Sequence, residues 1–322
     1  MTREMRFEIH EKDAGKPVLE FLAARFTYHC AEAWARLIAE GRVRVNGGVP
    51  DGRATLRAGD RLCYEAGEIP EPPVETGFTV LAEDALMAAI DKPGNLPCHP
   101  GGRYFNHTLW ALLKARGGFP DPIFINRLDR ETSGVVLVGK TKEAAQNLSK
   151  QFASHSVVKR YTVFVEGLFP ERADAAGWLM PDSGSAVRKK RRFVPAAPGS
   201  ACPAGAAWEW AETAFERTGA QDGMSVVTAT PRTGRLHQIR ATLLGLGYPV
   251  VGDKLYGVDE NLFIRFCSDA LTDSDLSRLR MGRQALHAGS LTFHHPRFGA
   301  RTEITAPLPA DMAALLGVAP AG

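Results

Sequence analysis

The hydrophobic residues of this chain fall into two blocks, which are separated by a short acidic segment rich in proline. In the first block, apolar side chains recur at helical spacing over residues 18–22 and again over 30–40, which predicts two amphipathic helices. Residues 42–45 alternate arginine with valine before Asn46-Gly47, which predicts a half-buried strand with exposed arginines and a tight turn. A second turn and a short strand at 56–64 complete the block.

The acidic segment between the blocks covers residues 67–77 and contains three prolines and three glutamates. This composition predicts an extended linker that repels phosphate. The chain should therefore consist of a small module at 1–66 and a larger domain at 78–322, each with its own core.

The apolar runs of the larger domain predict a mixture of strands and helices. Expected strands lie at 78–81, 86–90, 123–125, 135–138, 159–165, 211–216 and 224–230, and expected helices at 108–114, 142–152 and 233–243, the last with Thr233 as N-cap. Residues 170–212 are rich in alanine, glycine and proline, which predicts an irregular excursion from the sheet. A last strand is expected after Leu286-His287-Ala288.

Charge and composition narrow the class of protein without identifying a partner. Lys and Arg number 39 and Asp and Glu 36, a weak excess, and the basic run at 188–192 suits either a phosphate site or a solvated loop. The five scattered cysteines predict reduced thiols, and the spacing of His99, His237 and His287 fits no metal-ligand set. A polar N-terminus and the lack of any apolar run of about 18 residues predict a cytoplasmic protein without a membrane span.

The stretch 123–139 carries the strongest candidate for chemistry. Two β-branched runs predict buried strands around a polar loop, in which Asp129 stands between Arg127 and Arg130. Opposite charges so close should keep the carboxylate ionised. A rigid ionised carboxylate can act as nucleophile or base, but a salt-bridged turn explains the same residues, and this stretch alone favours the turn.

Two other residues could complete a site with Asp129. Arg240 lies beside the apolar stripe of the expected helix 233–243, and a partly buried arginine is costly unless a carboxylate pairs with it. Tyr161 follows the cationic pair at 159–160 and could support an unstacked base, although a core tyrosine is the simpler interpretation.

Six motifs follow one another through the second block: DKPGNLPCHP, INRLDRETSGVVLV, KRYTVFVEG, TGRLHQIRATL, GDKLYG and LHA. In this order and spacing they resemble the RluA family of pseudouridine synthases, over about residues 78–298. The resemblance implies an α+β catalytic domain with a bent mixed, mainly antiparallel sheet and a central cleft. It also implies isomerisation of uridine to pseudouridine in structured RNA, with no cofactor and no metal.

The resemblance assigns roles to individual residues of this chain. It makes Asp129 the catalytic aspartate, which Arg240 would hold in place. Arg127 would occupy the space left when the target uridine flips out, while Tyr161 would stack against the flipped uracil and Leu286 would pack near it. Family members usually read H-R-L-D where this chain begins with Asn126; because that histidine is not the catalytic group, activity should be retained.

The first block resembles the S-four RNA-binding domain in its segments ARLIAEGRVRVNG and LRAGDRLCYE. This resemblance implies a small α/β module in which Arg36, Arg42 and Arg44 face RNA phosphates; a hairpin with solvated arginines is the alternative. An RNA-binding module ahead of a catalytic domain favours large-subunit ribosomal RNA over transfer RNA as the substrate, and the enzyme is expected to be a monomer.

Other functions stay open at this level. They are the same chemistry on transfer RNA, a non-catalytic RNA-binding or ribosome-assembly protein that keeps the fold, and a glycoside or nucleoside hydrolase. The intact Asp129, Tyr161 and Arg240 argue against the second, and hydrolysis usually needs two carboxylates where the resemblance supplies one. The sequence also leaves open whether Asp129 attacks the anomeric carbon of the sugar or removes a proton from its 2′ position.

Overall fold

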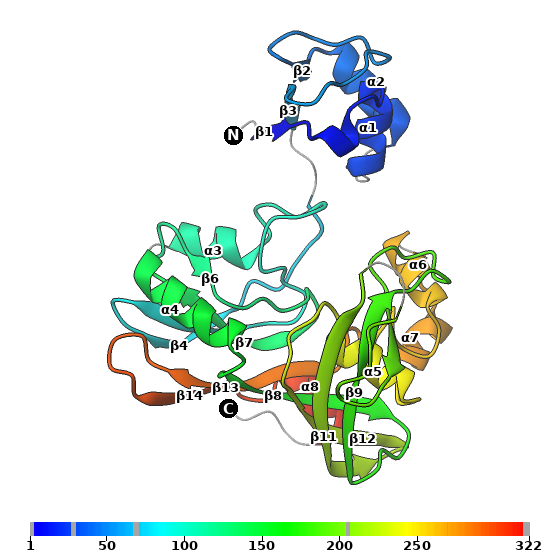
Figure 1. The fold of residues 1–322 in the computed structure, drawn as a ribbon. Helices are drawn as coiled ribbons and strands as arrows, with labels where there is room; N and C mark the ends of the chain where they lie inside the picture. The colour runs from blue at the N-terminus through cyan, green and yellow to red at the C-terminus, as the bar shows by residue number, and fades with distance from the viewer. Residues whose placement is uncertain are drawn as a thin grey trace. The chain divides into compact units, whose positions relative to one another are not determined.

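The computed structural model describes residues 3–26, 30–66, 71–116, 118–203, 207–268 and 270–317. The chain divides into two compact units (Figure 1). The small unit comprises Met1–Pro73 with His99–Thr108, and the large unit comprises Val74–Cys98 with Leu109–Gly322. Among the described residues, no helix has the length and apolarity needed to cross a membrane.

The small unit is built from a three-stranded antiparallel sheet, in the order β1-β3-β2, and two α-helices. Its described elements are β1 (Arg3–Glu8), the 3-10 helix η1 (Glu11–Asp13), α1 (Val18–Arg25), α2 (Ala31–Ala39), β2 (Val43–Val45) and β3 (Arg61–Ala66). Its core centres on Trp34 and Tyr64, whose rings lie 4.7 Å apart. The two predicted helices and the arginine strand are present, whereas β1 was not predicted, although residues 3–8 alternate charged and apolar side chains.

The second half of the predicted linker is held in place by hydrogen bonds. Residues 67–70 lie outside the described residues. The carboxylate of Glu71 accepts hydrogen bonds from the backbone N–H groups of Phe105, Asn106 and His107, at 2.6–2.8 Å. Glu71 therefore anchors the loop that contributes 99–108 to the small unit, and it is not part of a freely extended segment.

The large unit is an α+β structure around a sheet of eleven described strands (Figure 1). Its elements are β4 (Thr79–Glu83), β5 (Met87–Lys92), α3 (Leu109–Arg116), β6 (Ile123–Phe124), β7 (Ser133–Gly139), α4 (Lys142–Ala153), β8 (Val158–Glu166), β9 (Arg172–Pro181), β10 (Arg191–Pro195), β11 (Glu209–Gln221), β12 (Met224–Pro231), α5 (Gln238–Gly245), α6 (Asn261–Cys267), α7 (Asp273–Leu279), β13 (Leu286–His294), β14 (Arg301–Thr305) and α8 (Ala310–Leu315). The strand order is β10-β9-β11-β12-β8-β13-β7-β5-β4, with β14 on β13 and β6 on β7. Only the β13–β7 pair among these strands is parallel, so the predicted mixed, mainly antiparallel sheet is confirmed.

Strand β7 is an interior strand of this sheet, paired with β13 on one side and β5 on the other, and both of its faces are apolar. All of its residues are buried. Val136 and Val138 pack into one hydrophobic cluster with Leu109 of α3, whereas Val135 and Leu137 pack into another with Leu148 of α4. A continuous apolar run suits a strand covered on both sides, and the loop that carries Asp129 enters this strand.

The prediction of an irregular excursion over 170–212 was wrong. Residues 172–181 and 191–195 form β9 and β10, and β11 already begins at Glu209. Small residues alternate along β9 and point inward, where a larger side chain would not fit: a Cβ on Gly177 would lie 2.3 Å from the carbonyl oxygen of Val194. The period of two is present, but alanine and glycine hide it from a hydrophobicity pattern.

The basic run 188–192 and the segment before the last strands also differ from expectation. Lys190 is buried and forms an ion pair with Glu260, while Arg188, Lys189 and Arg192 are exposed, so the run is neither wholly a loop nor one uniform basic surface. Residues 286–288 do not precede a strand but begin β13. None of the five cysteines, all of which are described, forms a disulfide.

Candidate active site

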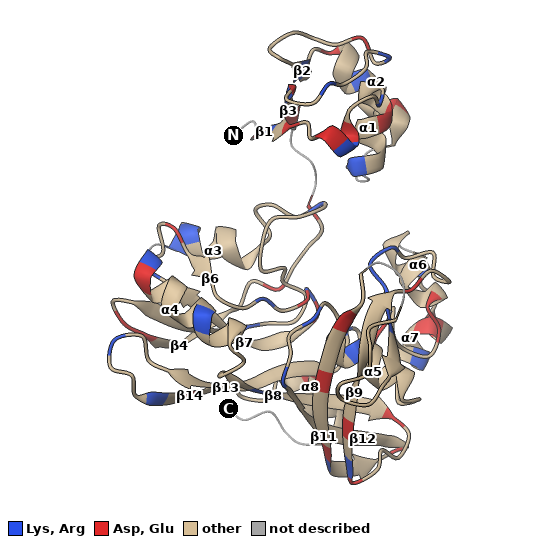
Figure 2. Ribbon diagram, in the orientation of Figure 1, with Lys and Arg blue, Asp and Glu red and all other residues tan. Residues whose placement is uncertain are grey.

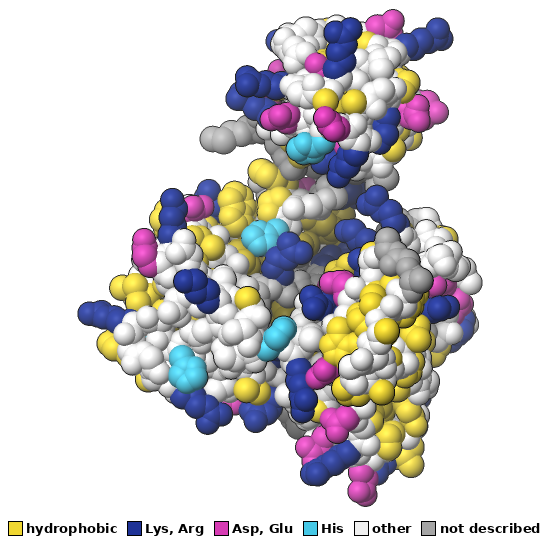
Figure 3. Space-filling model, in the orientation of Figure 1, with side chains coloured by type: hydrophobic (Ala, Val, Ile, Leu, Met, Phe, Trp, Pro, Cys, Tyr) yellow, Lys and Arg dark blue, Asp and Glu magenta, His cyan; other side chains and the backbone are white. Residues whose placement is uncertain are grey.

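One pocket of the large unit is lined by the loop 127–132, by β8, by residues 231–240 and by Leu286 at the start of β13. Figure 3 shows that this unit is hollowed between two lobes and that Lys and Arg side chains gather along the hollow. The pocket encloses about 110 Å³. Pockets for drug-sized ligands usually measure roughly 300–1,000 Å³, so this one suits a single planar ring.

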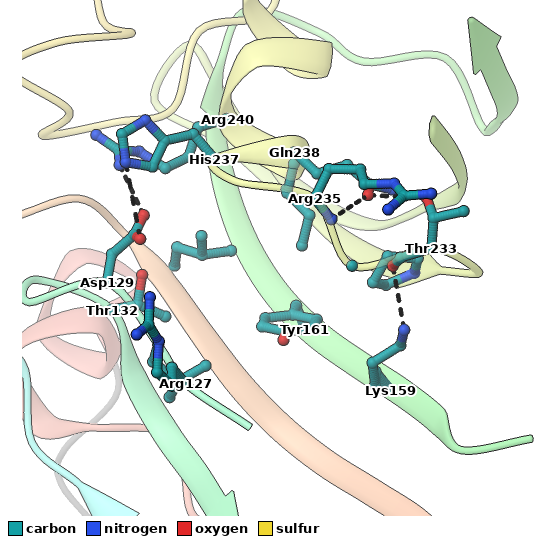
Figure 4. A pocket seen from close by; sticks show the side chains of 15 residues that line it. Arg127, Asp129, Thr132, Lys159, Tyr161, Thr233, Arg235, His237, Gln238 and Arg240 are labelled. Atoms are coloured by element: carbon teal, nitrogen blue, oxygen red, sulfur yellow. Dashed lines mark hydrogen bonds and ion pairs between the residues drawn. The ribbon is translucent and has the colours of Figure 1, made fainter. Parts of the chain in front are cut away.

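The ion pair that the sequence predicted is present in this pocket. Arg240 donates from Nη1 to Oδ2 of Asp129 at 2.7 Å (Figure 4). Among the described residues Arg127 forms no ion pair with Asp129, and Arg130 pairs with its neighbour Glu131 at 3.0 Å. The interpretation as a locally salt-bridged turn was therefore wrong, because the paired cation comes from a helix 111 residues away in the chain.

A second carboxylate, which sequence reasoning missed, fixes the guanidinium of Arg240. Asp253 accepts from Nε at 2.6 Å and from Nη2 at 2.9 Å, in a fork-to-fork arrangement. The Asp253 side chain is fully buried and also accepts the backbone N–H groups of Leu255 and Tyr256. The sequence feature that could have revealed this partner is the aspartate of the GDKLYG motif, because a buried arginine favours a buried carboxylate beside it.

The electrostatics of this cluster keep Asp129 ionised. Burial by itself raises the pKa of Asp129, but the charge and hydrogen bond of Arg240 outweigh burial, so the pKa lies below its ordinary value. The side chain of Asp129 is nevertheless 30% exposed, whereas that of Arg240 is only 9% exposed. The carboxylate is thus charged, held from behind and open toward the pocket.

His237 borders the carboxylate but carries no charge at neutral pH. Burial lowers its pKa to about 4, because the imidazolium form would lose its hydration. Its Nδ1 lies 2.9 Å from the hydroxyl of Tyr256, and its Nε2 lies 3.8 Å from Oδ1 of Asp129. His287, the other described histidine of the large unit that was considered as a metal ligand, is held separately by Ser133.

The helix that carries Arg240 begins later than predicted. α5 starts at Gln238, preceded by His237 with a left-handed φ of +55°, so Thr233 is not its N-cap. The Thr233 hydroxyl instead donates to the side chain of Gln238 at 2.8 Å and accepts the backbone N–H of Glu212. These bonds fold 231–237 into a loop along the pocket, and Leu236, which lies within the helix predicted over 233–243, is 39% exposed in this loop.

The remaining residues predicted for the site line the same pocket. Tyr161 rises from β8 as its partly buried floor, and burial, with the charge of Asp129, raises its pKa to about 12, so its hydroxyl is neutral. Leu286 is buried at the start of β13, and Arg127 is exposed at the rim. Lys159, two residues before Tyr161, also lines the pocket and was not predicted as a site residue.

Two polar residues behind the pocket hold the loop of Asp129. The amide of Asn126 donates to the carbonyl of Val135 at 3.1 Å and accepts the N–H of Leu137 at 2.7 Å, which ties the loop to β7. Lys92 is fully buried and donates to the carbonyl of Arg130 at 3.2 Å. Burial lowers the pKa of this lysine to about 8.

Figure 2 shows basic and acidic residues interspersed on the small unit, which carries the arginines predicted to bind RNA. Two of these arginines, Arg42 and Arg44, lie within 4.0 Å of Glu40 and Glu65. Arg36 on α2 and Arg44 on β2 are exposed and Val43 between the strand arginines is buried, whereas Arg42, just before β2, is half-buried. Arg42 donates from Nε to the carbonyl of Glu65 at 3.1 Å.

Comparison with known proteins identifies relatives over most of the chain. The sequence profile of the RNA pseudouridylate synthase family matches residues 87–244. The ribosomal large subunit pseudouridine synthase D of Zymomonas mobilis is 30% identical over 90% of this chain and 90% of its own length. The mitochondrial tRNA pseudouridine(32) synthase of Saccharomyces cerevisiae is 32% identical over 78% of this chain and 52% of its own length.

A solved structure shares the fold. Human RNA Pseudouridylate Synthase Domain Containing 1 superposes with a TM-score of 0.57 at 24% identity, covering 76% of this chain and 89% of that one. The region matched by the family profile contains Asp129, Tyr161 and Arg240.

Proposed function

The chain belongs to the RNA pseudouridine synthase family and isomerises uridine to pseudouridine in RNA, and we propose that Asp129 is the catalytic carboxylate of this reaction. One observation carries the assignment: an ionised, partly exposed carboxylate is held by Arg240 at the edge of a pocket floored by Tyr161. The pocket suits a single base better than a whole nucleotide, as expected for a base that must leave its stack to react.

The chemistry needs a group of this kind. The bond between C1′ and N1 breaks, a new bond joins C1′ to C5, the hydrogen of C5 leaves as a proton, and N1 gains one. Asp129 either adds to C1′ or removes a proton at C2′, and both roles require the ionised carboxylate. Tyr161 supports the flipped ring, and Leu286 packs beside it. Arg127, exposed at the rim, is placed to enter the gap that the base leaves in the RNA.

Arg240 acts on the carboxylate rather than on the RNA. Two hydrogen bonds to Asp253 hold its guanidinium on one side, and a third donates to Asp129 on the other, so these three bonds set the direction of the catalytic oxygen. A carboxylate prepared in this way needs little reorganisation when charge develops at the sugar.

Large-subunit ribosomal RNA is the proposed substrate. A relative of Zymomonas mobilis with this name covers nearly the same length, and Arg36, Arg42 and Arg44 of the S-four-like small unit would contact phosphates outside the pocket. A tRNA substrate is the second candidate, because the yeast relative is named for one. We propose that the enzyme acts in the cytoplasm as a monomer; Asp129, Tyr161 and Arg240 meet within one chain, so the site needs no residue from a second copy.

Release of tritium tests the assignment of Asp129. Large-subunit ribosomal RNA, transcribed with uridine tritiated at C5, loses its label to water when C5 bonds to the sugar. Asp129→Asn should abolish release while RNA binding stays intact. Asp121 is an exposed acid in the preceding connection, between α3 and β6, and Asp121→Asn should release label like the native protein. Release by Asp129→Asn at the native rate would exclude Asp129 as the catalytic group.

The substrate is identified by the same assay with labelled total tRNA in parallel. Pseudouridine mapping of RNA from cells with and without the protein then locates the modified uridine.

A further inference from the structure

Lys159 is a buried cation that has no acidic partner in the part of the chain that the structure describes. Lys159 is 7% exposed, and its ammonium donates a hydrogen bond to the carbonyl of Thr233 at 3.1 Å. Among the described residues no carboxylate pairs with it, and burial is the cause that lowers its pKa. A buried charge with one neutral partner is costly, and an acceptor that arrives with the substrate offsets this cost.

The ammonium lies on the far side of Tyr161 from Asp129. Lys159 and Tyr161 are two residues apart on β8, so they face the same side at about 6.6 Å along the strand. In Figure 4, Tyr161 stands between Asp129 and Lys159. The charge of Asp129 contributes to the raised pKa of Tyr161 but is not among the causes for Lys159.

The wall around the ammonium leaves space on its pocket side. The residue facing it is Gly234, whose missing Cβ would lie 4.0 Å from Nζ. A planar ring resting on Tyr161, with its sugar at Asp129, would therefore present its far edge to Lys159.

We propose that the ammonium of Lys159 binds the O4 oxygen of the flipped uracil and selects uracil over cytosine. This inference rests on the proposed function, which puts C1′ at Asp129 and the base on Tyr161. C4 lies directly across the ring from N1, so its substituent points away from the sugar. Uracil has an acceptor oxygen there, whereas cytosine has an amino donor that would oppose the ammonium.

The same contact stabilises the reaction. When the bond between C1′ and N1 breaks, its electron pair stays on the base and is shared among N1, O2 and O4. The Lys159 ammonium keeps its proton and interacts with the growing charge on O4, which it does more strongly in the transition state than in bound uridine. A backbone phosphate is a less suitable ligand, because it would have to reach a side chain that is more than nine-tenths buried.

The first test compares Lys159→Met with Arg160→Met. Arg160 is the next residue of β8, but it is exposed and pairs with Glu303, so it controls for loss of a positive charge. With tritiated ribosomal RNA in single turnover, Lys159→Met should react roughly 10- to 100-fold more slowly, the loss expected for one charge-assisted hydrogen bond. Its RNA affinity should stay native, and Arg160→Met should keep the native rate.

Each other result of this comparison has a defined meaning. A native rate for Lys159→Met would overturn the proposal. Weaker RNA binding with a native rate at saturation would also overturn it and assign Lys159 to a phosphate. If the native protein releases no tritium, the proposed function fails first, and this inference falls with it.

The second test leaves the protein unchanged and so does not depend on how a variant folds. Synthetic RNA around the mapped uridine is prepared with 4-thiouridine or 2-thiouridine at that position, and the isomerised nucleoside is quantified by chromatography and mass spectrometry. Sulfur accepts hydrogen bonds weakly, so the 4-thio RNA should react slowly with the native protein but lose no further rate with Lys159→Met. Slowing by the 2-thio substitution alone, or independent losses from the two changes, would refute the assignment to O4.

Discussion

Asp129, Arg240 and Asp253 form a carboxylate–arginine–carboxylate cluster. Replacing Asp253 with asparagine tests the structural role of this cluster separately from the catalytic role of Asp129. In the native protein, Oδ1 of Asp253 accepts from Nη2 of Arg240 and from two backbone N–H groups, while Oδ2 accepts from Nε at 2.6 Å. Asparagine can keep the first oxygen, but it then places an NH₂ group against Nε. Two donors face each other, and a guanidinium that is 9% exposed loses its main counter-ion.

This geometry allows the loss in the free energy of unfolding to be approximated. Breaking a buried ion pair by changing one partner costs about 3–5 kcal/mol, and because Asp129 still pairs with Arg240, Asp253→Asn should cost about 3 kcal/mol. For a domain of this size that corresponds to a fall in Tm of roughly 6–12 °C. Asp129→Asn should cost about 1 kcal/mol or less, since its side chain is 30% exposed and solvent weakens the pair.

Differential scanning calorimetry of the full chain measures both variants. The transition of the large unit is recognised by its greater enthalpy, which scales with size. In the tritium assay the order should reverse: Asp129→Asn is inactive, whereas Asp253→Asn keeps activity reduced by up to roughly 100-fold, because it misplaces the carboxylate without removing it. A Tm of Asp253→Asn within about 2 °C of native, or a larger loss in Asp129→Asn, would refute this account of the cluster.

Two further predictions concern packing and pH. Gly177→Ala should destabilise the large unit by roughly 1–3 kcal/mol, because its Cβ would meet the Val194 carbonyl oxygen at 2.3 Å. Gly219→Ala, whose Cβ would meet its nearest atom at 3.8 Å, should change the urea midpoint little, and equal effects would contradict this reason. Burial lowers the pKa of His237 and His287 to about 4, below about 6.5 in the unfolded chain, so the unfolded state takes up protons first as pH falls. The contribution of these two histidines to stability should therefore be constant above about pH 6.5 and decline toward pH 4; His287→Gln should flatten this decline in urea titrations, and a decline as steep as native would count against it.

Local pattern predicted much of the fold around the site. The run of branched residues in β7 could only be satisfied by burial on both faces, and the loop before it had to present its polar residues elsewhere. The pattern failed along β9, where alanine and glycine occupy the inward positions. Their spacing becomes meaningful only when the neighbouring strand β10, with its carbonyl 2.3 Å from the missing Cβ of Gly177, is in place.

The ion pairs of the candidate site were likewise only partly predictable from the sequence. A partly buried arginine needs a carboxylate, which predicted the pairing of Arg240 with Asp129 before any coordinates. The same principle required a counter-charge for the rest of the guanidinium but could not say that Asp253 supplies it. That choice depends on a turn after β12 and α5 that brings position 253 back beside position 240.

The sequence by itself determined which side chains had to be satisfied: an apolar strand, a lone carboxylate in a loop, an arginine beside an apolar stripe. These follow from composition and period, since burial and charge impose the same costs in any fold. The tertiary structure alone decided which of two neighbours is buried, for Lys159 lines the pocket while Arg160 lies in solvent. It also decided the left-handed turn at His237 and the partner of Arg240, because each depends on segments distant in sequence meeting at one pocket.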